Sequence, residues 1–446
     1  MLVDGARRET AASFVWRPPL AICLAITVAA EAGLLATRHL SSTRGIALAI
    51  VAAAAWGFVV SDPQLESRPR WVATAIVVAF AIAIAVPPRG SHDLWSYVMY
   101  GRTVGVHHAS PYLHAPSAYP HDPFLHLVSS GWQGTRSVYG PLFTGLSAIL
   151  TRLAGTSVLR ARLAFQGLAL VGVVASLGLV WKETRSVRSL AFVGLHPAVV
   201  TAIVNGGHND GLVGLSVLAG AVLVGKRRVT AAGVAVGLGM LVKASTAFGI
   251  LGIAVWLATR DRRSALRFLT VAALTTVAGY AFAGSAALRT VADAAGRTSR
   301  ASVWSPISRV LPGAVGGAAL LTVVVLALVG ARRFRSESGP ALAVAAAFAA
   351  YLVAGAYVLP WYPAWALPSA ALVRRSWVAI LVAAHAAFLV AAYELPRRVA
   401  SGSLSALVRG IAFATVAFAV LAAFVAFLSR SHPAEPSRTP VVTAGE

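Results

Sequence analysis

Asp93 is the acidic side chain of this sequence that packing explains least well. It lies in the phrase SHDLWSY, seven residues beyond an apolar run at 71–86, and it opens a long loop rich in His, Tyr and Trp. A carboxylate just outside a membrane helix can act as a general base on a substrate held at the membrane surface. The same carboxylate could instead cap a helix that begins near Leu94. Catalysis is the interpretation that we favour for Asp93.

A second polar group, His208, Asn209 and Asp210, ends the phrase NGGHND between two apolar runs. Polar side chains at membrane depth are costly unless they face a wet cavity or one another. Gly206 and Gly207 permit a tight turn at this place. The polar residues either line a binding site or break and cap a helix, and one residue can do both.

A lone ammonium, that of Lys243, lies between two further apolar runs. It should either pair with an anion, for which a lipid phosphate is suitable, or extend its charge to the membrane surface. Farther along, Trp361 and Tyr362 stand in the phrase LPWYPAW, whose two prolines predict a shaped, non-helical rim. Sugar rings stack well on such side chains, although aromatic residues at a span end also form the ordinary interfacial belt.

The loop 88–139 holds six of the eleven histidines. No pair of them has the i, i+4 spacing with Glu that a zinc hydrolase uses, so we predict no metal site. The other carboxylate of this loop, Asp122, precedes Pro123 and is expected to cap a helix whose first residue is that proline.

The composition requires a membrane protein. The chain is 58% hydrophobic and only 12% charged, with a mean hydropathy of +0.75, whereas soluble domains carry about 25% charged residues. The net charge of +23 does not indicate a nucleic-acid partner, because the Arg residues are spread through loops between apolar segments. Positive charge in such loops sets membrane topology and contacts anionic lipid.

Apolar periodicity and length place the candidate helices as follows. They are expected at approximately 18–36, 45–60, 71–87, 141–155, 161–181, 189–204, 209–224, 229–242, 244–258, 264–284, 313–331, 340–359, 361–373, 376–394 and 404–429. Residues 1–430 are expected to form one transmembrane domain, and the proline-containing segment 431–446 a disordered cytoplasmic tail.

Charge bias predicts the orientation. If the N-terminus is cytoplasmic, three spans place the loop 88–139 outside. The basic clusters at 182–185, 226–228, 260–263, 332–335 and 374–375 then all face inward only if 141–155 does not span the membrane. That arrangement puts Asp93, 208–210, Lys243 and 360–362 on the outer side together. It also leaves Arg289, Arg297, Arg300, Arg309, Arg397 and Arg398 outside, where an anionic lipid substrate could use some of them.

These phrases, in this order, resemble the polyprenyl-phosphomannose-dependent mannosyltransferases of the GT-C superfamily, and most of all its α-1,6-mannosyltransferases that build mannan backbones of lipomannan-type glycolipids. The matching phrases are 93–101 with Tyr97, 110–112, 122–124, 132–135, 139–142 with Tyr139, 206–210, Lys243 and 360–362. The resemblance implies an all-α polytopic membrane protein of the GT-C type, with about 13–14 transmembrane helices and a large first extracytoplasmic loop.

The resemblance also implies a multi-pass protein of the cell membrane with an extracytoplasmic active site and a catalytic acid at Asp93. A polyprenyl-phosphate-mannose donor, a glycolipid or glycan acceptor, membrane lipid and inversion at the sugar belong to the same expectation. We expect Lys243 and a nearby Arg to stabilise the phosphate, and no metal or other cofactor. The remaining binding residues are expected to be Tyr97, Tyr139, His208, Asn209, Asp210, Trp361 and Tyr362.

Two alternatives share much of this pattern. A flippase or transporter for a lipid-linked glycan would also carry intramembrane Lys, Asp and aromatic groups, but it would not need a long outer loop that opens on an acid. A GT-C enzyme that uses another polyprenyl-phosphate sugar, such as arabinofuranose, would carry all the motifs above.

Overall fold

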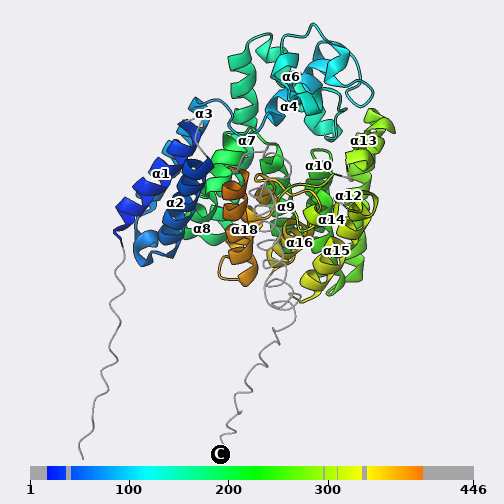
Figure 1. The fold of residues 1–446 in the computed structure, drawn as a ribbon. Coiled ribbons are helices and arrows are strands. Elements are labelled where there is room, and N and C mark those ends of the chain that lie inside the picture. The colour runs from blue at the N-terminus through cyan, green and yellow to red at the C-terminus, as the bar shows by residue number, and fades with distance from the viewer. Residues whose placement is uncertain (1–17, 37–41, 295–296, 309, 334–338, 395–446) are drawn as a thin grey trace, which may run out of the picture.

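The computed structural model describes residues 18–36, 42–294, 297–308, 310–333 and 339–394. All regular elements in these ranges are helices, which confirms the all-α class (Figure 1). The helix expected at 404–429, the tail expected at 431–446, and Arg309, Arg397 and Arg398 lie outside the described residues.

The N-terminal half contains α1 (Leu20–Ala36), α2 (Ser42–Ser61), η1 (Pro63–Ser67), α3 (Pro69–Ala85), α4 (Asp93–Gly105), η2 (Pro116–Ala118), η3 (Leu125–Leu127), α5 (Ser130–Gln133), α6 (Pro141–Ala154), α7 (Val158–Thr184), α8 (Val187–Gly194) and η4 (Ala198–Val204). The C-terminal half contains α9 (Asp210–Gly225), α10 (Val229–Met240), α11 (Thr246–Ala258), α12 (Arg262–Ala283), α13 (Ala286–Ala294), α14 (Ser305–Ser308), α15 (Pro312–Arg333), α16 (Pro340–Ala354), η5 (Tyr362–Trp365), α17 (Leu367–Leu372) and α18 (Trp377–Tyr393).

Two of the expected helices are broken in the structure. The segment 189–204 consists of α8 and the π-helix η4, which are bent by 50° at a break that contains Pro197, because proline cannot donate the hydrogen bond that would continue α8. The segment 361–373 consists of η5 and α17, each of which has a proline in its first turn. The other expected segments within the described residues each correspond to one helix.

Four described helices are long and apolar enough to cross a membrane: Thr43–Ser61, Val158–Thr184, Arg262–Ala283 and Gly313–Arg333. The bent pair of α8 and η4 makes a fifth, and eight shorter apolar helices of 10–17 residues accompany them. At about 1.5 Å per residue these shorter helices do not reach across a hydrocarbon core of roughly 30 Å without flanking residues. The polytopic class is confirmed, and the count of about 13–14 spans stays a prediction.

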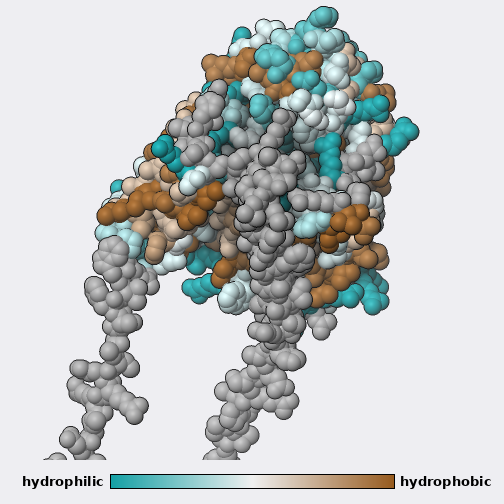
Figure 2. All heavy atoms as spheres, viewed as in Figure 1, coloured by the Kyte–Doolittle hydropathy of each residue, from teal (hydrophilic) through white to brown (hydrophobic). Residues whose placement is uncertain are grey.

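The outer surface of the bundle is apolar where lipid would contact it. Large exposed hydrophobic side chains lie on α2, α3 and α15, among them Ile50, Val77 and Leu321. Figure 2 shows hydrophobic residues over the α1–α2 side and over α15, with hydrophilic residues gathered above and below them.

The helices α4 and α6 form a layer above the bundle (Figure 1). We call residues 88–155 the cap. The segment 141–155, whose failure to span was expected from the charge pattern, is α6, and it packs in the cap against α4. The cap therefore contains the whole loop 88–139 together with the helix that follows it.

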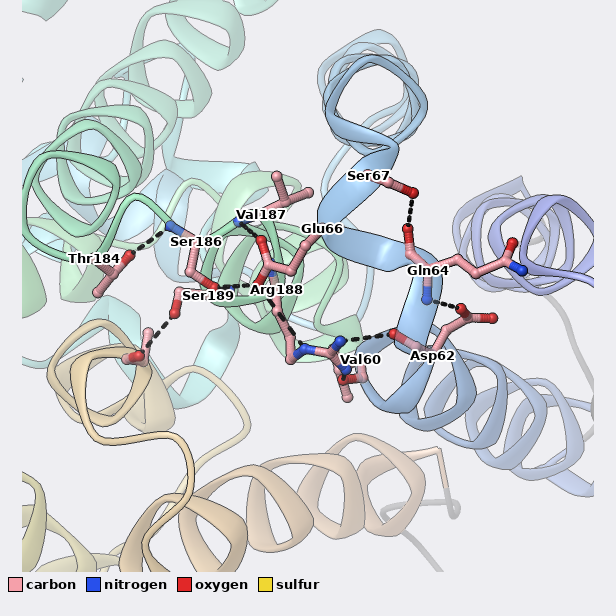
Figure 3. A network of polar contacts seen from close by, with 11 residues as sticks. Val60, Asp62, Gln64, Glu66, Ser67, Thr184, Ser186, Val187, Arg188 and Ser189 are labelled. Atoms are coloured by element: carbon pink, nitrogen blue, oxygen red, sulfur yellow. Dashed lines mark hydrogen bonds and ion pairs between the residues drawn. The ribbon is translucent and has the colours of Figure 1, made fainter.

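Two of the basic clusters, 182–185 and 226–228, lie together at the other end of the bundle. The 27-residue helix α7 begins beside the cap and ends at Thr184, about 40 Å away at the usual helical rise. There Glu66 accepts hydrogen bonds from Ser186 Oγ and from the amides of Val187 and Arg188 (Figure 3). An ion pair between Lys226 Nζ and Glu183 Oε1, 2.5 Å apart, joins the loop at 226–228 to the loop at 182–188. The loops 62–68, 182–188 and 226–228 thus share one end, which agrees with the prediction that the clusters 182–185 and 226–228 face the same side.

Candidate functional site

A cavity of about 380 Å³ lies between the cap and the bundle. Its walls include five of the residues singled out in the sequence, namely Asp93, Tyr139, Lys243, Trp361 and Tyr362. These residues come from the cap, from the α10–α11 turn and from the segment around η5, so segments up to 269 residues apart in the chain meet here. The structure thereby brings together three of the sequence phrases that were judged separately.

Asp93 is the first residue of α4, and His92 occupies the N-cap position. The alternative interpretation, in which Asp93 itself caps the helix, is therefore wrong by one residue: its amide donates to Ser91 Oγ at 3.1 Å, and its carboxylate lies in the first turn. Negative charge is favoured in that turn by the helix dipole. The side chain is 20% exposed, and among the described residues that line the cavity it is the only carboxylate.

His208 lies behind the cavity wall. Its imidazole stacks on Trp361 with ring centroids 3.9 Å apart, and its Nδ1 lies 3.2 Å from the Tyr97 hydroxyl and 4.0 Å from Asp93 Oδ2. Tyr97 is fully buried and packs edge-on against Tyr139 at 4.9 Å. The predicted binding residues Tyr97 and His208 thus support the wall from behind instead of lining it.

His208 borders a smaller cavity of about 60 Å³, which Trp361 also lines. Arg89 and Glu394 also line this cavity and form a two-pronged ion pair, both N–O distances being 2.8 Å. Trp361 therefore lines both cavities, whereas His208, which stacks on it, lines only the smaller one.

Lys243 is held by Asp210. Its Nζ lies 2.8 Å from Asp210 Oδ1, which also accepts a hydrogen bond of 2.6 Å from Trp365 Nε1. The ammonium faces the rings of Tyr362, Trp365 and Tyr139 at 4.7, 5.3 and 5.8 Å. Lys243 lines the cavity, whereas Asp210 is fully buried behind it.

The turn before α9 is fixed by buried amides. The Asn205 side chain donates to the carbonyls of Ala83, Val86 and Pro87 and accepts from the amide of Arg89. Gly207 has a φ of 65°, and a Cβ there would lie 2.7 Å from Leu94 Cδ1. Asn205 therefore has a structural role. Asn209, which was expected to bind substrate, is buried outside the main cavity, and its amide has no hydrogen bond among the described residues.

The cap is joined to the Lys243 turn through backbone contacts. Gly140 N donates to Val242 O and Leu142 N donates to Leu241 O, both at 3.0 Å. A Cβ on Gly140 would lie 2.2 Å from Leu241 O, so only glycine fits this approach. These two bonds place Tyr139 beside Lys243.

Several lining residues were not predicted as site residues. Arg297 lines the cavity with its guanidinium 4.1 Å above the ring of Trp132, and Tyr351 and Trp365 complete the aromatic wall. Arg297 was counted only as one basic residue on the outer side. An isolated Arg in a connecting segment carries no spacing signal, so the fold alone identifies it.

Asp122 does not have the capping role that was expected. No helix begins at Pro123; Asp122 accepts from the amide of Phe124 and pairs with Arg102 Nε at 2.8 Å and with His107 Nε2 at 2.8 Å. Burial raises the pKa of this carboxyl, but the hydrogen bonds from these three residues and the charge of Arg102 outweigh burial and leave the pKa below its ordinary value. Asp122 thus fastens the cap internally.

No metal-binding cluster is found in the part of the chain that the structure describes: no three His, Cys, Asp or Glu side chains gather there closely enough to hold an ion. The cap histidines bond locally, for example His92 Nδ1 to Leu127 O at 3.0 Å and His114 Nδ1 to Ser110 O at 3.3 Å.

Comparison with known proteins gives two matches in sequence. The family described as "alpha-(1->6)-mannopyranosyltransferase, N-terminal domain" matches residues 9–260, a range that includes Asp93 and Lys243. The chain is also similar to alpha-(1->6)-mannopyranosyltransferase A of Corynebacterium glutamicum, with 26% identity over 182 residues. That alignment covers 39% of this chain and 36% of the relative, so it spans about a third of the relative's length. No solved structure matches.

Proposed function

The chain belongs to the alpha-(1->6)-mannopyranosyltransferase family, whose N-terminal domain covers more than half of it, and from this premise we propose that it is a membrane-bound mannosyltransferase. The proposed donor is polyprenyl-phosphate-mannose and the proposed acceptor is a glycolipid or glycan that receives an α-1,6-linked mannose. The enzyme is of the GT-C type, acts in the cell membrane and works at its extracytoplasmic face.

The observation that carries this proposal is the composition of the main cavity. One carboxylate, two cations and a wall of aromatic rings meet there, and the side formed by α11 and α15 is apolar, with Phe248 on α11 and the aliphatic Leu320 and Val323 on α15. A carboxylate can take a proton, cations can bind phosphate, aromatic rings can hold a sugar, and an aliphatic wall can receive an isoprenoid chain. A lipid-phosphate sugar needs all four.

In the proposed reaction the acceptor hydroxyl attacks the anomeric carbon of mannose, and Asp93 takes the hydroxyl proton. The bond between that carbon and the phosphate oxygen breaks, and its electron pair leaves with the lipid phosphate. The group departs as a phosphate, so the reaction needs no metal to neutralise a pyrophosphate. A single displacement inverts the anomeric configuration. Trp361 and Tyr362 form the wall of the sugar pocket. His208 holds Trp361 in place, and Tyr97 holds Tyr139 in place.

The test is mass spectrometry of membranes that contain the protein, incubated with polyprenyl-phosphate-mannose and candidate acceptors. The wild type should add hexose, and Asp93→Asn should lower the rate by about 10²–10⁴-fold, because it removes a general base at nearly unchanged volume. Asp62→Asn is a matched control, since Asp62 caps η1 at the far end of the bundle and Asn caps equally well.

Two results would contradict the proposal. Turnover of folded Asp93→Asn near the wild-type rate would restrict this carboxylate to a structural role. Addition of pentose from a polyprenyl-phosphate-arabinose donor, with no hexose from the mannose donor, would assign the enzyme to a different sugar.

A further inference from the structure

We propose that Arg297, and not Lys243, is the principal ligand of the phosphate group of the lipid donor. The inference rests on the proposed function for the identity of the ligand, a lipid-linked phosphate ester. It assigns a binding role to a residue outside the family's matched range of 9–260.

The charge of Lys243 is already neutralised within the protein. Asp210 lies 2.8 Å from its Nζ and is fully buried, so the two side chains form a neutral pair. Three aromatic rings surround the same ammonium within 5.8 Å. An anion that approached Lys243 would meet the combined field of a cation and a carboxylate, which is much weaker than that of an unpaired cation.

The charge of Arg297 is not neutralised in this way. Among the described residues, no carboxylate lies within ion-pair distance of its guanidinium; its contacts are the face of Trp132 at 4.1 Å and the hydroxyl of Thr135 at 3.4 Å. A guanidinium has five N–H donors, so most of them stay available. Arg297 is therefore the lining cation that can give both charge and donors to a ligand.

The position of Arg297 also relates it to the catalytic carboxylate. Tyr100 lies two turns after Asp93 on the same face of α4, and its hydroxyl donates to Thr135 O at 2.9 Å. Arg297 contacts the hydroxyl of the same Thr135. Thr135 thus links the helix that carries Asp93 to Arg297. The side chains of Asp93 and Arg297 both line the cavity.

The chemistry of the leaving group favours a guanidinium. As the bond to the anomeric carbon breaks, the phosphodiester becomes a phosphomonoester and gains negative charge on a second oxygen. A guanidinium can donate two parallel hydrogen bonds to two phosphate oxygens, whereas an ammonium acts as a point charge. Arg297 would then stabilise the transition state more than the bound donor, which is what catalysis requires.

The test measures binding of geranyl phosphate to the full-length protein in nanodiscs by calorimetry, with geraniol and inorganic phosphate as further probes. Arg297→Gln should weaken geranyl phosphate binding about ten- to hundredfold and leave geraniol binding unchanged. Arg297→Lys should recover part of the affinity. Arg289→Gln is the matched control, because Arg289 is exposed on α13 and does not line the cavity.

Lys243→Met/Asp210→Asn removes the neutral pair as a unit and should change geranyl phosphate affinity less than Arg297→Gln does. A larger loss in that double variant than in Arg297→Gln would place the phosphate at Lys243 and overturn the inference. Equal affinity for inorganic and geranyl phosphate would overturn the assignment to a lipid phosphate.

Failure of the proposed function gives a different result. If the wild type transfers no mannose but loses geranyl phosphate binding with Arg297→Gln, the phosphate site stands and the sugar assignment fails. If the wild type transfers mannose and Arg297→Gln binds geranyl phosphate normally, the mannosyltransferase assignment stands and the phosphate site at Arg297 fails.

Discussion

Removing Lys243 should destabilise the protein more than removing its partner Asp210. Lys243→Met leaves the fully buried Asp210 carboxylate with the Trp365 N–H as its remaining hydrogen-bond donor among the described side chains. Breaking a buried ion pair from one side costs about 3–5 kcal/mol. Asp210→Asn should cost less, because three rings still face the ammonium and each cation–π contact contributes about 0.5–2 kcal/mol.

The measurement is the free energy of unfolding in detergent micelles for the two single variants and the double variant Lys243→Met/Asp210→Asn. The double variant should lose less than the sum of the single losses, with a coupling of about 1–3 kcal/mol. Lys226→Met is the matched control: its pair with Glu183 is exposed, and exposed pairs contribute about 0–1 kcal/mol. Simple additivity of the two single losses would refute the reasoning that Lys243 and Asp210 form one neutral unit.

Three further predictions concern the cap. Gly140→Ala should destabilise the protein by about 1–3 kcal/mol in the same unfolding assay, since its Cβ would lie 2.2 Å from Leu241 O, whereas Gly145→Ala in α6 has open space and should be neutral or stabilising. Asp122→Asn should be less stable than the wild type at neutral pH. Because the folded pKa of Asp122 is lowered, the stability difference between wild type and variant should be full above the carboxyl's ordinary pKa of about 3.9 and should shrink as pH falls through the lower folded value. A stability difference that stays constant into that acidic range would contradict this prediction. In intact cells Ser117→Cys should react with an impermeant thiol reagent and Arg228→Cys should not; both positions are exposed, and the opposite labelling would reverse the proposed orientation.

Sequence patterns located the site phrases because polar groups between apolar runs are costly and therefore informative. Lys243 stood out for this reason, Asp93 because it opens a long loop just beyond an apolar run, and Trp361 and Tyr362 because two prolines flank these aromatic residues. The structure brings the four residues to one cavity. The patterns did not separate lining residues from supporting ones. Whether a side chain such as Tyr97 faces the cavity depends on the rotation of α4, which long-range packing decides.

Other features needed the three-dimensional arrangement. The pairing of Lys243 with Asp210 joins residues 33 positions apart, and the pairing of Arg102 with Asp122 joins residues 20 apart. No helical or strand periodicity relates such positions. The prolines next to the two breaks, Pro197 and Pro368, are visible in the sequence, but apolar composition on both sides made each segment resemble one continuous helix.

The backbone contact between Gly140 and Val242 also limits how substrates can enter and leave. Three backbone hydrogen bonds join the chains at this contact, from Gly140, Leu142 and Phe143, and no space for a Cβ remains at Gly140. The Tyr139 segment and the Lys243 turn are therefore held together as one unit. Lifting the cap away from the bundle would break these hydrogen bonds and carry Tyr139 away from Lys243. Exchange of a long lipid without such a rupture has to occur sideways, past the aliphatic wall that α15 contributes to the cavity.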